Sequence, residues 1–246
     1  MAKGARIDFE TRVRCVTEAI PVIVSDVKAA IQVDAMHKAG NEIVGAFMLG
    51  KAWYEAHGYN IVLRSLITAE ILALNRIYDW RERRPLHQQN KASIPVVLAL
   101  LEDDDTLVHF QDEARLWNPG MGFEDHNAAL VVESIGDARS KWEALWQPGH
   151  DGRAHLDTLR AYRDSRVAHV LVDVLPGVIP QYSHLPLLLL ETLPIIKPLA
   201  LALTGIEHDF ESMLRESSRQ AEAFWRSFLA GAPPAPSLIP RLAGCS

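Results

Sequence analysis

The sequence is poor in cysteine and lacks the patterns that identify most disulfide, metal and phosphate sites. Cys15 and Cys245 are its only cysteines, which excludes a disulfide framework and a metal-spaced pair and favours a reducing compartment. There is no Gly-rich phosphate loop, no internal repeat and no strand-like alternation of useful length. The first residues, MAKGARIDFETR, have no apolar segment of the kind that opens a secretory signal. We therefore expect a cytoplasmic protein without a cofactor.

Positive charge is also scarce over the whole chain. The 246 residues include 25 Lys and Arg against 31 Asp and Glu, a net charge of −6 at pH 7. This balance argues against a surface that coats nucleic acid broadly, but it permits a local basic cleft. The length suits one large domain. We predict a single all-helical domain over residues 1–230, followed by a disordered Pro- and Ala-rich tail over 231–246.

Apolar residues recur at helical spacing in nearly every segment, so we predict an all-α helical bundle of seven to nine helices and no sheet. The clearest pattern covers residues 60–82, where Leu63, Ile67, Ile71 and Leu74 share one face. Other helices are expected over about 7–20, 126–146 and 207–229. We expect a kink or a new helix at Pro21, a break at Gly40–Asn41, a stop at Gly58 and a helix capped by Ser93.

One apolar run, residues 185–206, is long enough to cross a bilayer. It contains Glu191 and Lys197, and charges in the middle of a span are costly in lipid. Prolines interrupt it at positions 186, 194 and 198. We interpret the run as a kinked, buried helix without contact to a membrane, with Leu187–Leu190 and Ile195–Ile196 in the core or in an interface.

The stretch LRAYRDSRVAHVLVD, residues 159–173, concentrates ionisable side chains in a segment that otherwise has the pattern of a buried helix. At about 100° per residue, one polar stripe holds Tyr162, Arg166, His169 and Asp173. Asp173, one turn after His169, can accept a proton from one ring nitrogen and leave the other for chemistry. Arg163 lies about 120° away from His169 on an α-helix, so it must reach sideways or meet the histidine of a second subunit.

Spacing alone leaves a plain structural interpretation open. An arginine, a histidine and an aspartate on a half-buried helix more often form an ion-pair cluster than a catalytic site. This alternative predicts that His169→Ala lowers thermal stability and changes no activity. A set formed by Asp105, His109 and Asp112 on one helical face is likewise more typical of an exposed acidic face than of a metal site.

The wording of the stretch resembles a known motif. Arg163-Asp164, followed by four residues and His169, resembles the R-x(4–6)-H motif of HEPN domains, and YRDSRVAH is similar to the form found in abortive-infection HEPN proteins. A second stretch resembles the same branch: ILALNRIYD, residues 71–79, is an apolar helix ending in R-x-x-D, and NKASIP, residues 90–95, is a polar loop with S-I-P opening a helix. The two matches span about residues 60–175.

The resemblance implies an all-helical, usually dimeric and metal-independent ribonuclease, often a toxin or a phage-defence protein. In that role His169 would act as general base and Arg163 would stabilise the transition state, with Asp164 or Asp173 orienting one of them. Some HEPN toxins carry a tyrosine two residues after the histidine, which an antitoxin modifies. This chain has Leu171 there, which places that mode of regulation in doubt, although an antitoxin or defence-system partner is still expected.

Supporting roles are expected for Arg76, Asp79, Arg166 and Asp173. Arg76 and Asp79 are three residues apart and can simply pair with each other. In the functional alternative, Asp79 orients Arg163 or His169 across a helix–helix contact. The loop RERRPLHQQNKA, residues 81–92, adds three arginines, which either solvate a helix end or guide RNA phosphates.

These considerations favour a metal-independent endoribonuclease with RNA as its partner. The imperfect facing of Arg163 and His169 on one helix leads us to expect a homodimer in which both residues of each subunit converge in one cleft at a two-fold interface. The alternative is a non-catalytic helical module that binds nucleic acid, nucleotide or a protein partner, which the net charge of −6 would also suit.

Overall fold

The computed structural model describes residues 7–49, 56–81, 84–89, 91–164 and 181–231, and these residues form eight α-helices, one short 3-10 helix and no strand. The all-α prediction is therefore confirmed. The predicted tail lies almost wholly outside the described residues. The elements are α1 (Phe9–Met48), α2 (Ala56–Ile77), η1 (Leu86–Gln88), α3 (Ile94–Leu100), α4 (Asp104–Arg115), α5 (Glu124–Leu145), α6 (Asp151–Tyr162), α7 (His184–Thr204) and α8 (Phe210–Ala230).

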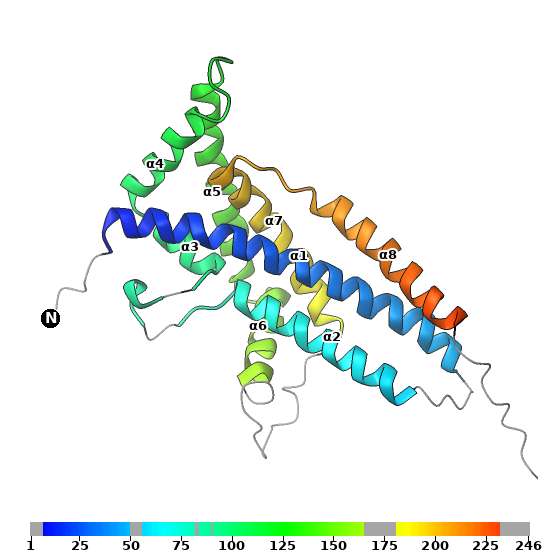
Figure 1. The fold of residues 1–246 in the computed structure, drawn as a ribbon. Helices are drawn as coiled ribbons and strands as arrows, with labels where there is room; N and C mark the ends of the chain where they lie inside the picture. The colour runs from blue at the N-terminus through cyan, green and yellow to red at the C-terminus, as the bar shows by residue number, and fades with distance from the viewer. Residues whose placement is uncertain (1–6, 50–55, 82–83, 90, 165–180, 232–246) are drawn as a thin grey trace, which may run out of the picture.

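Helix α1 is the central axis of the bundle. It is 40 residues long and begins where the Asp8 carboxylate accepts a hydrogen bond of 2.8 Å from the backbone N–H of Thr11. Figure 1 shows α2 and α8 on either side of its C-terminal half, with α7 passing close to its middle. Helices α4 and α5 pair at the other end of the molecule, and α5 also packs along α7. Buried side chains of α1 therefore line most of the core.

The predicted break at Gly40–Asn41 is wrong, because α1 continues through both Pro21 and Gly40. Gly40 is instead a contact site for α8. A Cβ atom added there would lie 3.0 Å from Cε2 of Trp225, and the Trp225 indole N–H donates a 2.8 Å hydrogen bond to the Met36 carbonyl. The glycine thus provides room for a tryptophan rather than ending the helix. The predicted stop at Gly58 is wrong as well, since Gly58 lies in the first turn of α2.

Helix α7 corresponds to the long apolar run. Within the described chain it is the one helix long and apolar enough to cross a membrane, and half of its most apolar window is buried. Leu188, Leu189, Ile195 and Ile196 belong to the core, as predicted. Leu187 and Leu190 are 48% and 53% exposed because three-residue spacing places both on the outer face. They are therefore outside the core of the subunit, and their place in an interface stays a prediction.

A group of ionisable side chains is buried between α1, α2 and the start of α7. Glu70 of α2 has no solvent exposure, and neither of its carboxylate oxygens has a hydrogen-bond partner. Burial, and then the charge of Asp34 on α1, raises the pKa of Glu70 to about 9. Burial lowers the pKa of His37, also on α1, to about 4. The Tyr182 hydroxyl donates a 3.0 Å hydrogen bond to Asp34. At neutral pH we therefore expect Glu70 to hold its proton.

The contact between α1 and α8 gives a matched pair of variants. Gly45→Ala, at an exposed position with no atom near the added Cβ, should raise the free energy of unfolding by about 0.5–1 kcal/mol because alanine favours the helix. Gly40→Ala should instead lower it by about 1 kcal/mol or more, because Trp225 is held by its own hydrogen bond and cannot move away. Urea unfolding of both variants measures the difference; an equal gain in both would contradict the close approach.

The buried carboxyl group gives a pH-dependent prediction. The folded pKa of Glu70 lies above its unfolded value, so its contribution to stability is complete below about pH 4.5 and is lost as pH rises towards 9. Glu70→Gln cannot titrate, so between pH 6 and 8 wild type should lose about 2 kcal/mol relative to this variant. Urea unfolding at both pH values tests this, with Glu133→Gln, an exposed carboxylate on α5, as the control. A constant difference across the range would refute the buried protonated carboxyl.

Candidate functional site

The candidate site is built around Tyr78, the residue that directly follows α2. Tyr78 is fully buried, and its ring stacks on Trp142 of α5 with centroids 5.9 Å apart. Its hydroxyl lies 2.8 Å from the hydroxyl of Thr192 on α7, which itself donates to the Leu188 carbonyl, so Tyr78 is the donor. Its own carbonyl accepts a 2.8 Å hydrogen bond from Arg160 of α6. Three helices therefore position the segment that follows Tyr78.

The next residue, Asp79, connects residues 71–79 with residues 90–95, the two segments of the second motif match. The hydroxyl of Ser93 donates a 2.7 Å hydrogen bond to the Asp79 carbonyl, and the Asp79 carboxylate forms an ion pair with Lys91. Ser93 is the residue before α3, as predicted, but its hydroxyl does not cap that helix. The R-x-x-D end of α2 and the S-I-P start of α3 are thus bonded to each other.

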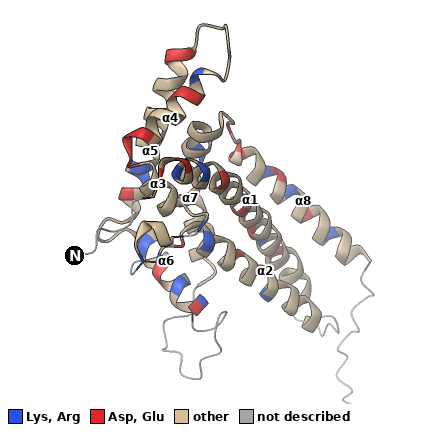
Figure 2. Ribbon diagram, turned by 60° about the vertical axis from the view of Figure 1, so that its left-hand side comes forward, with Lys and Arg blue, Asp and Glu red and all other residues tan. Residues whose placement is uncertain are grey.

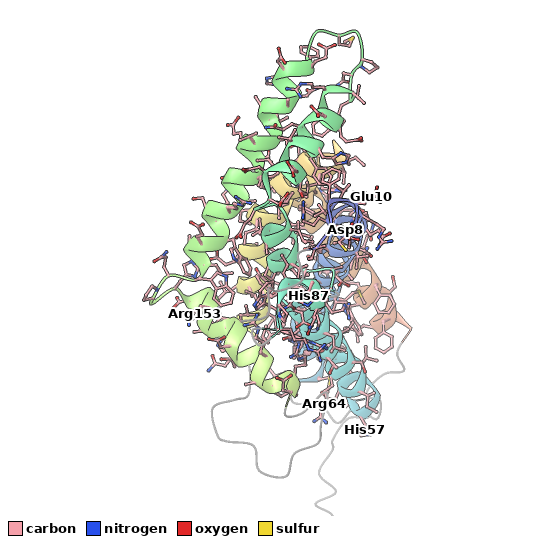
Figure 3. The ribbon with its side chains drawn as sticks, turned by 90° about the vertical axis from the view of Figure 1, so that its left-hand side faces the viewer. Asp8, Glu10, His57, Arg64, His87 and Arg153 are labelled. Atoms are coloured by element: carbon pink, nitrogen blue, oxygen red, sulfur yellow. The ribbon has the colours of Figure 1, made fainter. Side chains whose placement is uncertain are left out.

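The arginine-rich loop is held in shape by a buried glutamine. Gln89 is 6% exposed; its side-chain amide donates to the carbonyls of Arg81 and Arg84, at 2.6 and 2.8 Å, and accepts from the N–H of Arg81 at 3.2 Å. These bonds hold the backbone at both arginines. His87 marks the loop in Figure 3, in front of α2 and α3.

Arg81 and Arg84 face the end of α6 across a hollow of about 410 Å³. The residues that line it are Asp79, Trp80, Arg81, Arg84, Arg160, Arg163 and Asp164. With four arginines against two aspartates, the lining is net positive in a chain whose total charge is −6. Burial, together with the positive charge of Arg163, lowers the pKa of neighbouring Lys91. Figure 2 shows the Lys and Arg positions on α6 beside this region. We name this surface the basic hollow.

Arg163 and Asp164 lie where α6 ends at Tyr162 and the backbone widens into a π-helical turn. The Nε of Arg163 donates a 2.8 Å hydrogen bond to Oδ1 of Asp164, and its Nη2 lies 2.7 Å from the same oxygen in an ion pair. The Arg163 side chain is 27% exposed and that of Asp164 is 63% exposed. One edge of the guanidinium is therefore held by its neighbour, and Arg163 is still partly open to solvent.

Comparison with known families identifies the family of the chain. Residues 50–224 match the family model HEPN_AbiU2, described as AbiU2. The chain belongs to the AbiU2 family of HEPN domains. It is therefore a HEPN protein of the abortive-infection type, as the two motifs predicted, and the match extends beyond the expected motif core into α8. No curated protein and no solved structure matches the chain.

The structure covers part of the predicted AbiU2 site. Asp79, Arg163 and Asp164 line one hollow, whereas Arg166, His169 and Asp173 lie outside the described residues, as does Leu171. The 120° offset expected between Arg163 and His169 assumed an unbroken α-helix. The structure does not test that offset, because His169 lies outside the described residues.

Arg76 has a different partner from the one expected. Its guanidinium forms two hydrogen bonds with Asp26 of α1, at 2.9 and 2.6 Å, while Asp79 pairs with Lys91. Arg76 is not among the residues lining the basic hollow. The predicted Arg76–Asp79 pair is thus replaced by two separate ion pairs. Tertiary contacts decide these two pairs, because Asp26 is 50 residues away from Arg76 in the sequence and Lys91 lies in the loop before α3.

The three residues considered as a possible metal site, Asp105, His109 and Asp112, all lie on α4. The ring of His109 packs edge-to-face on Phe9 and Phe110, at centroid distances of 5.6 and 5.3 Å. No group of three or more His, Cys, Asp or Glu side chains that could hold a metal ion occurs among the described residues.

Four residues of the candidate site were given no individual role from the sequence: Trp80, Gln89, Lys91 and Arg160. Lys91 lies within the quoted stretch NKASIP and Trp80 directly follows ILALNRIYD, and this proximity to the motif is the signal that pointed to them. Gln89 carries no periodic pattern, and Arg160 has the spacing of an ordinary surface arginine. Their roles depend on contacts between α2, α3 and α6.

The Asp79–Lys91 pair can be tested through stability. Both side chains are about one fifth exposed, so removing one should leave the other partly buried without its counter-charge. We expect Asp79→Asn and Lys91→Met each to lower the free energy of unfolding by about 1–2 kcal/mol, and the double variant to lose about 1 kcal/mol less than the sum.

The exposed pair Asp137–Lys141 on α5, with Nζ and Oδ2 2.7 Å apart, is the matched control. The same cycle there should give a coupling below about 0.5 kcal/mol, because solvent screens both charges. Equal coupling at the two pairs would show that Asp79 does not neutralise a partly buried lysine.

Proposed function

We propose that this HEPN protein is a metal-independent endoribonuclease of a phage-defence or toxin–antitoxin system. The observation that carries the proposal is the basic hollow: Arg163 of the family motif shares it with Arg81, Arg84 and Arg160 in a protein that is acidic overall. A concentrated positive patch beside the motif suits a phosphodiester, because phosphate contacts supply most of the affinity for RNA. We place the protein in the cytoplasm, with RNA as substrate.

In the proposed reaction the RNA supplies its own nucleophile. His169 removes the proton from a ribose 2′-OH, since a neutral imidazole titrates near the working pH. The 2′ oxygen then forms a bond to the adjacent phosphorus, and the bond from phosphorus to the 5′ oxygen breaks. The leaving oxygen takes up a proton. The products are a 2′,3′-cyclic phosphate and a 5′-OH, and no metal-bound water is required.

Arg163 would stabilise the charge that develops on the phosphorane-like transition state. Asp164 holds the Nε and Nη2 side of its guanidinium, so the Nη1 edge would meet a phosphate. The carboxylate of Asp79 would neutralise the positive charge of Lys91 beside it. Arg166 and Asp173 are proposed as supporting residues, with Asp173 orienting His169. Arg76 could act only indirectly, through α2, since its own guanidinium bonds Asp26.

We further propose that the protein acts as a homodimer. Two copies of the motif related by a two-fold axis would bring two arginines and two histidines to one groove, which concentrates positive charge where a phosphate docks. It would also allow one histidine to serve as base while another group protonates the leaving oxygen. A partner protein that restrains this activity, such as an antitoxin, would then act on the same groove.

The activity is tested by incubating the protein with total RNA in EDTA. We expect cleavage by wild type and a loss of about 100-fold or more in Arg163→Ala and in His169→Ala, the usual range for removing a transition-state donor or a general base. Arg115→Ala, on α4 and paired with Asp112, is the matched control and should cleave normally. End-group analysis should find a 2′,3′-cyclic phosphate.

Other outcomes would select the alternatives. A protein that binds RNA but cleaves it neither in EDTA nor with Mg²⁺ added would favour a non-catalytic nucleic-acid-binding module. A lower melting temperature in His169→Ala with unchanged activity would favour a purely structural cluster. Mixing Arg163→Ala with His169→Ala subunits tests the two-fold site. Partial recovery of cleavage would show that the arginine of one subunit acts with the histidine of the other. No recovery would show that both residues act within one chain, or that cleavage needs both arginines and both histidines.

A further inference from the structure

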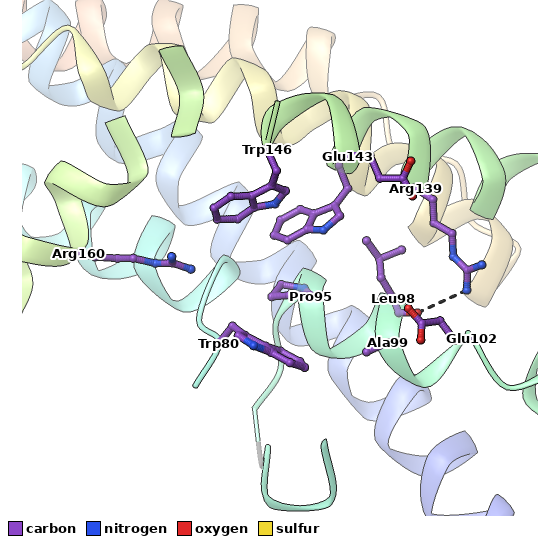
Figure 4. Close-up of a pocket in the computed structure, with 10 residues that line it drawn as sticks. Trp80, Pro95, Leu98, Ala99, Glu102, Arg139, Glu143, Trp146 and Arg160 are labelled. Carbon is purple, nitrogen blue, oxygen red and sulfur yellow. Dashed lines mark hydrogen bonds between the residues drawn. The ribbon is translucent and has the colours of Figure 1, made fainter. Parts of the chain in front are cut away.

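A second pocket, of about 520 Å³, adjoins the basic hollow. Three tryptophans and two arginines dominate its lining: Trp80, Trp142, Trp146, Arg139 and Arg160. Trp80 comes from the segment after α2, Arg160 from α6, and the other three from α5 and its C-terminal cap. Figure 4 shows Trp80 on one wall and Trp146 on the opposite wall, with Pro95 between them at the back. We name this surface the tryptophan pocket.

Contacts within the protein hold the wall of the tryptophan pocket that Trp142, Trp146 and Arg160 form. Trp146 packs edge-on against Trp142 at a centroid distance of 5.1 Å, and Trp142 stacks on the buried ring of Tyr78. The Arg160 guanidinium lies 5.6 Å from the Trp146 ring centroid and bonds the Tyr78 carbonyl. Preorganised aromatic walls of this kind bind planar ligands at little entropic cost.

The two surfaces are continuous, because Trp80 and Arg160 line both of them. A polyanionic chain that sets one phosphate beside Arg163 therefore passes Arg160 on its way out of the basic hollow. Beyond Arg160 the lining includes Trp80 and Trp146, and the Trp146 ring centroid lies 5.6 Å from the Arg160 guanidinium. Alternation of cationic and aromatic side chains is the arrangement by which proteins bind single-stranded nucleic acid, with phosphates on the cations and bases on the rings.

We propose that the tryptophan pocket binds one nucleobase of single-stranded RNA, next to the phosphate held in the basic hollow. The inference rests on the proposed function and adds the form of its substrate: an unpaired strand whose base stacks between Trp80 and Trp146. A base within a duplex is already stacked on its neighbours and cannot enter. The carboxylates of Glu102 and Glu143 at the rim can accept hydrogen bonds from an exocyclic amine.

Binding of two fluorescein-labelled octamers to the whole protein tests this. One is 2′-O-methyl oligoadenylate, which cannot be cleaved by 2′-OH attack; the other is the same backbone without bases. We expect Trp80→Leu and Trp146→Leu each to weaken binding of the oligoadenylate about 5- to 150-fold and to leave binding of the abasic octamer within about twofold. Trp80→Phe, which keeps an aromatic face, should retain most of the affinity.

Two controls separate stacking from folding and from phosphate binding. Trp117 packs over Gly205 of the α7 cap and lines neither pocket, so Trp117→Leu should change neither affinity. Arg84→Ala should weaken both octamers equally. Equal binding of the two octamers to wild type, with both weakened in Arg84→Ala, would overturn the base pocket and leave the ribonuclease proposal standing. Failure of both octamers to bind would also overturn the base pocket, and cleavage of total RNA in EDTA decides the ribonuclease proposal separately.

Discussion

The hydrogen bonds and packing of Tyr78 are the interactions on which the candidate site depends. This one fully buried side chain meets α7 through its hydroxyl and α5 through its ring, while its carbonyl receives Arg160 of α6. A buried tyrosine hydroxyl without a partner would be costly, so the Thr192 bond fixes the depth of the ring. The two residues after it, Asp79 and Trp80, then enter the two adjoining pockets in a defined direction.

Local electrostatics, rather than the charge of the whole protein, shapes the basic hollow. Four guanidinium groups come from two segments, the loop after α2 and the end of α6. Gln89 holds the loop backbone, Asp79 offsets the charge of Lys91, and Asp164 engages Arg163. The charges of Lys91 and Arg163 are thereby partly neutralised, which lowers the repulsion among the neighbouring cations; an incoming phosphate would neutralise the rest.

Helical periodicity in the sequence predicted the fold class and most helices, because one-face apolar spacing depends only on neighbours within a few turns. The same reasoning failed where a distant residue decides the outcome. Gly40 has the local signature of a helix end, yet it lies inside α1 because Trp225 fills the space a side chain would occupy. Leu187 and Leu190 were expected in the core or in an interface, and the fold places both on the outer face of α7.

The sequence by itself determined the family and the motif residues Arg163 and Asp164, since these depend on residue identities at short spacing. It also placed Asp79 and Ser93 in the order of the second motif match, without showing that they bond each other. Only the tertiary structure decided that Asp79 pairs with Lys91 and Arg76 with Asp26. It likewise joined Trp80 to Trp146 and Arg160 in one pocket. The physical reason is that a long cation bonds whichever carboxylate the packing of helices brings within reach, and that choice lies outside any local pattern.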